Sequence, residues 1–162
     1  MQAADADAVL AVQQAAYPPS HHESWAVLGR KLALWPTGCW VLEDEEGLLA
    51  YLFSHPGRLD APPLLHADLQ LPERPDAYAI HDLALHPRAQ GRGLARLLVA
   101  QAEMQAQQAG LPAMSLVAVQ GSAAFWSRFG FALARPAPPQ LASYGGAAVF
   151  MTRAAPGTPA AR

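Results

Sequence analysis

The sequence predicts an α/β fold in which a mixed sheet is covered by helices. Segments with apolar residues at helical spacing alternate with apolar runs of strand length. Their order along the chain is two helices, a hairpin, and then strand, helix, strand, helix, strand. A hairpin pairs its strands antiparallel, whereas strands joined through a helix can pair parallel, so both kinds of pairing are expected.

Length and composition favour a globular enzyme. The 162 residues are 52% hydrophobic and 15% charged, with a net charge of −2. We expect a single domain over residues 1–153 and a flexible tail over residues 154–162. The pI of about 6.3 argues against a nucleic-acid partner, which usually requires a basic surface.

Three further features indicate a cytoplasmic protein without a metal. No basic region precedes the first apolar stretch, and no apolar run reaches the roughly 18–20 residues that span a membrane. Cys39 is the one cysteine and cannot form an internal disulfide. The six histidines lack metal-ligand spacing, so no metal site is expected; His21, His22 and Glu23 could bind an ion, but a solvated loop is the favoured interpretation.

Two helices are expected first. The first runs from Asp5 to Tyr17, with Asp5 as a possible cap, and the following prolines end it. The second runs from Glu23 to Leu34, where apolar residues recur at helical spacing until Pro36. Its tryptophans are interpreted as core residues.

A hairpin and a long connection come next. Residues 39–55, CWVLEDEEGLLAYLFSH, hold two apolar runs around an acidic turn that ends in Gly47. Residues 56–76 are rich in proline and show no regular pattern. A connection of about twenty such residues is often functional, although a plain surface excursion is the alternative.

The second half alternates strands and helices. The expected elements are a strand at Ala77–His86, a helix at Gly91–Ala109, a strand at Met114–Val119, a short helix at Ser122–Phe129 and a last strand at Gly146–Arg153.

The turn between the expected strand at Ala77–His86 and the expected helix at Gly91–Ala109 has the composition of a phosphate-binding site. Gly91 and Gly93 lack a Cβ, so a ligand can approach the backbone closely. The amides of the first helical turn have no partner within the helix and lie at the positive end of its dipole. Arg88, Arg92 and Arg96 are expected to add positive charge.

Two nucleotide-binding patterns fail at this turn. A dinucleotide site has a third glycine where this chain has Arg96, and an acidic residue after the next strand, where this chain has Gln120 and Gly121. No Gly-Lys-Ser/Thr follows, so the pattern of a P-loop is absent as well.

The same stretch resembles the GCN5-related N-acetyltransferases (GNAT). Gln90 to Ala95 matches their Gln/Arg-x-x-Gly-x-Gly/Ala segment, and Phe125 to Phe131, FWSRFGF, is similar to their Phe-Tyr-x-x-x-Gly-Phe. The resemblance implies a mostly antiparallel mixed sheet with about four helices. The family opens with a strand, but only Met1 to Ala4 precede the first helix here, so the first edge strand is expected to be short or missing.

The resemblance also implies acetyl-CoA as the co-substrate. Turn amides would hold its pyrophosphate, and the strand around Leu83 would pair with its pantetheine arm. The implied binding residues are Leu83, Ala84, Leu85, Gln90, Gly91, Arg92, Gly93, Leu94, Ala95, Arg96, Ser122, Phe125, Trp126 and Arg128.

A narrower likeness concerns the strand itself. IHDLALHP followed by QGRG is similar to the arylalkylamine N-acetyltransferases, in which His81 would fall on a histidine that removes a proton. The preceding histidine of that family is Ala79 here, and Tyr17 to Glu23 lies where the family keeps a substrate-gating loop.

Strand alternation predicts that Ala79, His81, Leu83 and Leu85 share one face, with Asp82 on the other. Histidine titrates near neutral pH, so His81 can take the proton of an amine, directly or through a water. The alternative is a polar residue with a satisfied hydrogen bond. Asp82 is interpreted as structural.

The sequence therefore predicts acetyl transfer from acetyl-CoA to a primary amine of a small, partly apolar substrate, by direct attack in a ternary complex. The expected catalytic residues are His81, Leu83 (whose amide would hold the oxyanion) and Tyr144, since the Trp126 indole cannot act as an acid. The expected substrate-binding residues are Tyr17, Glu23, His81 and Tyr144. The alternative for Glu23 is that its carboxylate only interacts favourably with the dipole at the start of its helix.

Two other functions remain alternatives: a peptide acetyltransferase and a non-catalytic acyl-CoA sensor. Both a monomer and a homodimer remain open.

Overall fold

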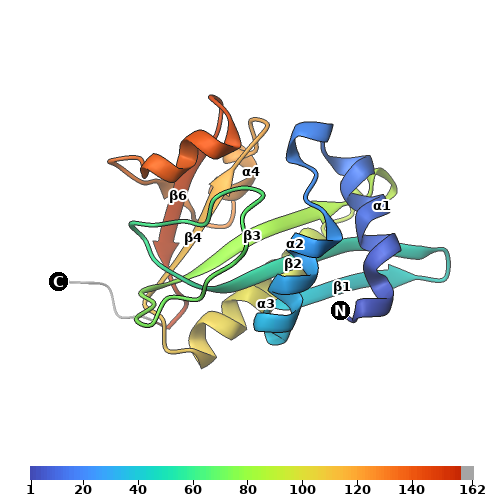
Figure 1. Cartoon of the computed structure of the whole chain (residues 1–162), viewed down its shortest axis with the longest axis horizontal. Coiled ribbons are helices and arrows are strands. Elements are labelled where there is room, and N and C mark those ends of the chain that lie inside the picture. Colours follow the sequence, from blue (N-terminus) through green and yellow to red (C-terminus); the bar gives the residue numbers. More distant parts are fainter. Residues whose placement is uncertain (158–162) are drawn as a thin grey trace.

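The computed structural model describes residues 1–157 and contains one six-stranded mixed sheet (Figure 1). The strand order is β1-β2-β3-β4-β6-β5, and only β3 and β4 pair parallel. The mostly antiparallel sheet is thus confirmed. The strands are β1 (Cys39–Asp44), β2 (Gly47–Gly57), β3 (Ala77–Leu85), β4 (Ala113–Ala118), β5 (Ala132–Leu133) and β6 (Val149–Ala154).

Four α-helices cover the two faces of the sheet: α1 (Ala6–Ala16), α2 (Trp25–Leu34), α3 (Ala95–Gln108) and α4 (Ala123–Ser127). Side chains alternate along β2, so Tyr51 and Phe53 pack with α1 and α2, whereas Leu52 packs with α3 and α4. Figure 1 shows α1 and α2 on one side of the strands and α3 on the other. The expected helix layers are confirmed.

Several predicted boundaries are wrong, each for a local reason. The helix expected from Gly91 begins at Ala95, because Gly91 and Gly93 have φ of +73° and +71° and form a left-handed turn instead. The last strand begins at Val149 rather than Gly146, because residues 146 and 147 form a turn in which the Ala148 N–H donates to the Gly145 carbonyl at 3.1 Å. The two-residue β5 and the short 3-10 turns were not predicted.

The ends of the chain also depart in part from expectation. A 3-10 turn, Ala3–Asp5, precedes α1, and β1 forms the sheet edge, with the Met1 ammonium donating to the Cys39 carbonyl at 3.3 Å. The expected flexible tail from residue 154 is wrong at its start: Ala154 belongs to β6, and the buried Ala155 donates its N–H to Pro112. The rest of that prediction, over residues 158–162, lies outside the described residues.

A β-bulge lies in the middle of β3. The pairing with β2 passes from Phe53 opposite Asp82 to Ser54 opposite Ile80, so His81 is the extra residue. The bulge reverses the alternation, and Ile80, Leu83 and Leu85 all pack toward α3. The prediction that His81 shares a face with Leu83 and Leu85 is therefore wrong.

The parallel pair β3 and β4 separates toward its C-terminal ends. Pairing covers only Tyr78–Ile80 against Met114–Leu116, although β3 continues to Leu85 and β4 to Ala118. Beyond the pairing, the β4-facing edge of β3 has no strand partner among residues 1–157. Within residues 1–157, no helix is both long and apolar enough to cross a membrane.

Candidate active site

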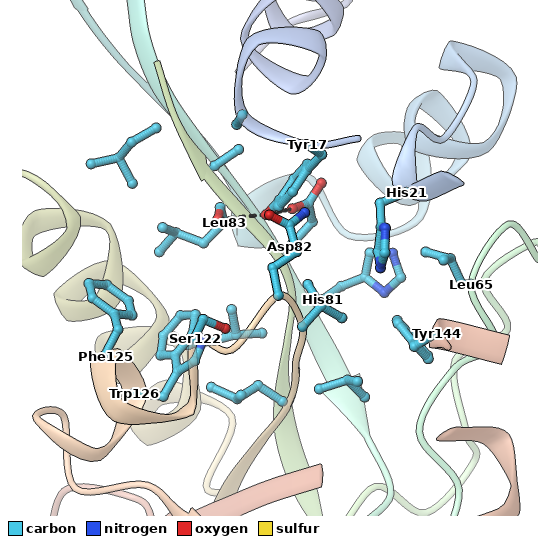
Figure 2. Close-up of a pocket in the computed structure, with 18 of the residues that line it drawn as sticks. Tyr17, His21, Leu65, His81, Asp82, Leu83, Ser122, Phe125, Trp126 and Tyr144 are labelled. Carbon is cyan, nitrogen blue, oxygen red and sulfur yellow. Dashed lines mark hydrogen bonds between the residues drawn. The ribbon is translucent and has the colours of Figure 1, made fainter. Parts of the chain in front are cut away.

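A cavity of about 420 Å³ opens where β3 and β4 separate. Its wall combines the end of β3 (residues 80–85), the end of β4 with the turn after it, the glycine turn, α4 and three loops (Figure 2). The predicted site residues that line it are Tyr17, Glu23, His81, Leu83, Ala84, Leu85, Gln90, Gly91, Ser122, Phe125, Trp126 and Tyr144. Asp82 also lines it.

The turn that contains Gly91 and Gly93, here called the glycine turn, closes one end of the cavity. Its backbone is suited to binding an anion. A Cβ at Gly91 or Gly93 would meet nothing within 4 Å, so the backbone there is open. The amides of residues 91–96 donate to no acceptor within residues 1–157, and the fourteen-residue helix α3 begins behind them. Free amides at a helix N-terminus favour a phosphate group.

The arginines near this turn behave differently from expectation. Arg88 was expected to add charge to the site, but its guanidinium donates to Asp44 and to the Gly47 carbonyl and pairs with Glu46. Arg92 is exposed on the turn itself, and Arg96 is exposed in the first turn of α3. The remaining predicted cofactor residues that do not line the cavity are Arg92, Gly93, Leu94, Ala95, Arg96 and Arg128.

Helix α4 supplies an aromatic wall. Trp126 is buried, with its ring centroid 5.0 Å from that of Phe125 and 5.8 Å from that of Phe131. Figure 2 shows Ser122, Phe125 and Trp126 together at the α4 side of the cavity, beside Leu83. The Trp126 indole N–H is a donor that keeps its proton, so this wall offers contact rather than acid catalysis.

A buried ionic network forms the opposite side. Glu23 Oε2 lies 2.8 Å from His81 Nε2 and 3.1 Å from Lys31 Nζ, and all three side chains are at most 2% exposed. The other oxygen, Oε1, accepts the backbone N–H of His66 at 2.9 Å. Burial alone would raise the pKa of Glu23, but the hydrogen bonds and charges of His81 and Lys31 lower it to about 2.

Because Glu23 stays ionised and fully bonded, it is a poor base at neutral pH and a poor partner for a second cation. The helix expected from Glu23 begins at Trp25 with Ser24 as its N-cap, and the Glu23 carboxylate bonds Lys31 and His81. His81 Nδ1 is buried and has no partner within residues 1–157.

Asp82 ties two tyrosines to the strand end. Its Oδ1 lies 2.8 Å from the Tyr17 hydroxyl, and its Oδ2 accepts from Tyr51 at 2.7 Å. The Tyr17 hydroxyl is also 2.9 Å from the Leu83 carbonyl oxygen. Burial raises the pKa of Asp82, and burial together with Asp82 raises the pKa of both phenols. These bonds fit the structural role expected for Asp82.

The proline-rich connection covers the end of the cavity near His81. Tyr144 donates to the Pro63 carbonyl at 2.8 Å, and the Leu65 N–H donates to Ser143 at 3.1 Å. Burial, with smaller contributions from two carboxylates, raises the pKa of the Tyr144 phenol. Figure 2 shows His21, Leu65 and Tyr144 gathered near His81, on the side away from Phe125 and Trp126.

The sequence indicated the loops at 17–23 and 56–76 near the substrate but did not single out His21, Leu65 or Lys31 as residues of the substrate site; of these, Lys31 does not line the cavity but pairs with the lining Glu23. His21 and Leu65 line the cavity from loops, where no periodicity marks an inward side chain. Lys31 did leave a signal, because it lies three positions after the buried Leu28 on the inner stripe of α2. A lysine on an apolar stripe needs a buried anion, which here is Glu23.

Comparisons with solved structures place this architecture among acetyltransferase folds. The chain is similar to a GphF GNAT-like decarboxylase in complex with isobutyryl-CoA (18% identity, TM-score 0.73, 95% of this chain and 96% of that one). It is also similar to the ribosomal-protein-S18-alanine N-acetyltransferase of Escherichia coli (16%, 0.65, 96% and 90%). A third similar structure is a GNAT family acetyltransferase of Brucella melitensis in complex with acetyl-CoA (19%, 0.57, 95% and 84%).

No curated protein sequence matches the chain. The sequence model described as the acetyltransferase (GNAT) family, however, matches residues 6–131, from α1 through the end of FWSRFGF. That match agrees with the sheet, the glycine turn and the cavity between the separated strands. The chain therefore belongs to the acetyltransferase (GNAT) family and is an acetyl-CoA-dependent N-acetyltransferase.

Proposed function

We propose that this enzyme acetylates a primary amine of a small, partly apolar molecule, by direct attack of the amine on acetyl-CoA in a ternary complex. The observation that carries the proposal is one continuous cavity, which joins the open glycine turn to the buried Glu23–His81 pair beneath a fixed loop. Donor and acceptor can thus meet beside β3 between the bulge at His81 and the strand end at Leu85, where positioning supplies much of the rate.

The donor would be held mainly by backbone groups. The free amides of residues 91–96 suit the pyrophosphate, and the unpaired edge of β3 at Leu83–Leu85 suits the amides of the pantetheine arm. In a strand, the N–H and C=O of one residue point to the same edge, and the Leu83 carbonyl meets the Tyr17 hydroxyl at the cavity wall. This supports the Leu83 N–H as the donor to the developing oxyanion.

His81 is the base in this proposal. His81 lines the cavity but its side chain is only 1% exposed, so we assign the proton transfer to a path through one water rather than to direct contact. The pair with Glu23 leaves Nδ1 as the nitrogen without a partner among the described residues.

The departing thiolate has two possible proton sources. The hydrogen bond of Tyr144 to Pro63 supports a role in holding the loop, and an acid role requires that this bond break. A thiolate is a tolerable leaving group near neutral pH, so solvent can supply the proton. Substitution of Tyr144, described in the Discussion, separates the two roles.

The charge of the cavity lining and the loops that enclose the cavity indicate which class of amine the enzyme accepts. No lysine or arginine is among the described residues that line the cavity, which disfavours an acceptor carrying a carboxylate or phosphate. The two lining carboxylates, Glu23 and Asp82, are bonded to protein groups. The loop contacts of Leu65 and Tyr144 leave less room for a peptide than an open groove would.

A panel of acceptors tests the proposal. Acetyl-CoA is mixed with arylalkyl and alkyl monoamines, with amino acids and with short peptides bearing a free α-amine, and released thiol is measured. We expect turnover with monoamines to exceed that with peptides by at least tenfold in kcat/KM. Preference for a peptide would instead support an acceptor like that named for the Escherichia coli structure. Binding of acetyl-CoA without any turnover would support a sensor.

A further inference from the structure

The carboxylate of Glu23 is fixed on both of its oxygens. Oε2 meets His81 Nε2 and Lys31 Nζ, while Oε1 accepts the N–H of His66. An ionised carboxylate only accepts hydrogen bonds, so His81 Nε2 at 2.8 Å must carry the hydrogen. A neutral imidazole with its hydrogen on Nε2 has its lone pair on Nδ1.

We propose that Glu23 is a positioning residue that holds His81 in the Nε2–H tautomer, so that Nδ1 is the atom that receives the substrate proton. The inference rests on His81 being the base of the proposed function. Glu23 itself touches neither donor nor acceptor in this scheme. It acts by fixing the ring and its tautomer, as a buried carboxylate does for other catalytic histidines.

A neighbouring histidine provides an internal contrast. His55 Nδ1 lies 2.8 Å from the Pro56 carbonyl oxygen, so its hydrogen is on Nδ1 and its lone pair on Nε2. The two buried rings lie with centroids 6.1 Å apart and have opposite tautomers, each set by its own acceptor. The tautomer of His81 is thus specified by Glu23 and not by burial in general.

The charged and titratable groups around His81 do not offer a competing acceptor at Nε2. Lys31 of α2 donates to Glu23, His55 of β2 is bonded to Pro56, and Asp82 beside the bulge is bonded to Tyr17 and Tyr51. From the loops, Tyr144 donates to Pro63, His66 Nε2 meets the Ser20 carbonyl, and His21 Nδ1 meets Ser20 Oγ. Glu23 is the one carboxylate within hydrogen-bond distance of His81 among residues 1–157.

The same carboxylate also fixes the loop over the acceptor end. His66 adopts φ of +65°, a left-handed conformation that is unfavourable for a non-glycine residue. Its N–H donates to Glu23 Oε1 and its ring Nε2 lies 3.1 Å from the Ser20 carbonyl oxygen, which together hold this conformation. Loss of the Glu23 carboxylate should therefore weaken acceptor binding as well as displace the base.

The test compares Lys31→Met with Glu23→Gln/Lys31→Met. Removing the lysine first avoids leaving an unpaired buried ammonium, which would unfold the single Glu23 variant. In protein labelled with 15N-histidine, at a pH where the ring is neutral, nitrogen chemical shifts identify which ring nitrogen carries hydrogen. We expect the Nε2–H form for His81 in Lys31→Met and a mixture of tautomers in the double variant, with His55 unchanged as Nδ1–H in both.

Kinetics provide the second readout. The double variant should lose about 10- to 100-fold in kcat relative to Lys31→Met, with the KM for acetyl-CoA within about twofold and the KM for the amine raised. Glu23→Asp in place of Glu23→Gln in the double variant should recover part of the loss in kcat. Asp68→Asn, which removes an exposed carboxylate paired with Arg30, is the matched control and should behave as wild type.

Three results overturn the inference: an Nδ1–H tautomer for His81 in the wild type, an unchanged tautomer when Glu23 is neutralised, or an unchanged kcat in the double variant. A different result would show that His81 is not the base of the proposed function. His81→Ala would then stay fully active, while the tautomer of His81 would still depend on Glu23.

Discussion

An amine is protonated at neutral pH, so its attack on a thioester requires a nearby group that can accept a proton. At the scale of single residues, the cavity offers few such groups. Glu23, with its pKa lowered to about 2, binds a proton too weakly, and Asp82 is bonded to two phenols. His81 Nδ1 has no hydrogen-bond partner among residues 1–157, which makes His81 the strongest candidate.

His81→Ala should lower kcat by about 10² to 10⁴ while leaving acetyl-CoA affinity nearly intact, because general-base catalysis contributes on that scale. In the wild type, kcat/KM should rise with pH, because a base must be unprotonated to accept a proton, and this rise should be absent from the alanine variant. Steady-state kinetics over pH 5.5–9 check both. A normal rate with an unchanged pH profile in the alanine variant would place the base elsewhere.

The proton donor to the thiolate is the second question at this scale. Trp126→Tyr should keep the fold at a cost of about 1–3 kcal/mol in the free energy of unfolding, because the side chain is buried among phenylalanines. Its turnover should be equal to or faster than wild type, since a phenol can release a proton. Thermal unfolding and thiol release measure the two effects.

Tyr144→Phe separates an acid from a loop holder. Loss of the bond to Pro63 should raise the KM for the amine and leave kcat at saturating amine unchanged. A fall in kcat alone, without a change in KM, would assign the acid role to Tyr144. An unchanged kcat together with an active wild type leaves solvent as the proton source.

At the scale of elements, the glycine turn before α3 is the feature most accessible from sequence. Its residues are contiguous, and the family pattern of Gln90 to Ala95 encodes a local backbone shape. The start of the helix was misplaced because a helical pattern says nothing about which residues have positive φ. The bulge at His81 was invisible for a different reason: it is set by the register between β2 and β3, which are far apart along the chain.

Gly93→Val should abolish binding of coenzyme A while the protein stays folded. A valine at φ of +71° is strained, so the turn must change shape and its amides must move. Gly93→Asn is the matched control, because asparagine tolerates this conformation and should retain most of the affinity. Arg92→Ala should weaken coenzyme A binding less than Gly93→Val does, since the exposed charge of Arg92 acts in a high dielectric. Titration calorimetry showing unchanged affinity in Gly93→Val would remove the phosphate assignment.

At the scale of the whole molecule, the site is assembled from segments that no local pattern connects. Glu23 precedes α2, His81 lies 58 positions later in β3, and Tyr144 meets Pro63 across 81 positions. The sequence could place each residue in an element, but the ion pair with Lys31 and the loop contacts arise only when the helix layer packs on the sheet. For this reason the sequence could name Tyr17, Glu23, His81 and Tyr144, which line the cavity, but not the contacts that hold them there.

The same buried network should make the fold less stable in acid. The direction of this pH dependence follows from the lowered pKa values of His55 and Glu23. Burial, followed by the charge of His81, lowers the pKa of His55 from 6.5 to about 3, so the folded state holds this ring neutral. The unfolded chain binds a proton at His55 below pH 6.5 that the folded protein does not. Its contribution to stability is therefore complete above pH 6.5 and is lost as pH falls toward 3.

Glu23 adds to this loss at lower pH. Its pKa is lowered from 4.5 to about 2, so its contribution is complete above pH 4.5 and disappears as pH falls toward 2. Between pH 6.5 and 4.5 the contribution of Glu23 is constant, which makes this window suitable for isolating His55. One proton taken up on unfolding corresponds to a slope of about 1.4 kcal/mol per pH unit.

His55→Asn tests this contribution, because the asparagine amide can keep a hydrogen bond to the Pro56 carbonyl but does not titrate. Urea unfolding of wild type and variant at pH 7.0, 6.0, 5.0 and 4.5 measures the free energy of unfolding. The wild type should lose stability with falling pH more steeply than the variant, by up to about 1.4 kcal/mol per pH unit. Other groups, including Asp82 with its raised pKa, are present in both proteins and cancel in the difference. Parallel slopes would mean that His55 accepts a proton in the folded state, and that the ring beside His81 is not held neutral by the fold.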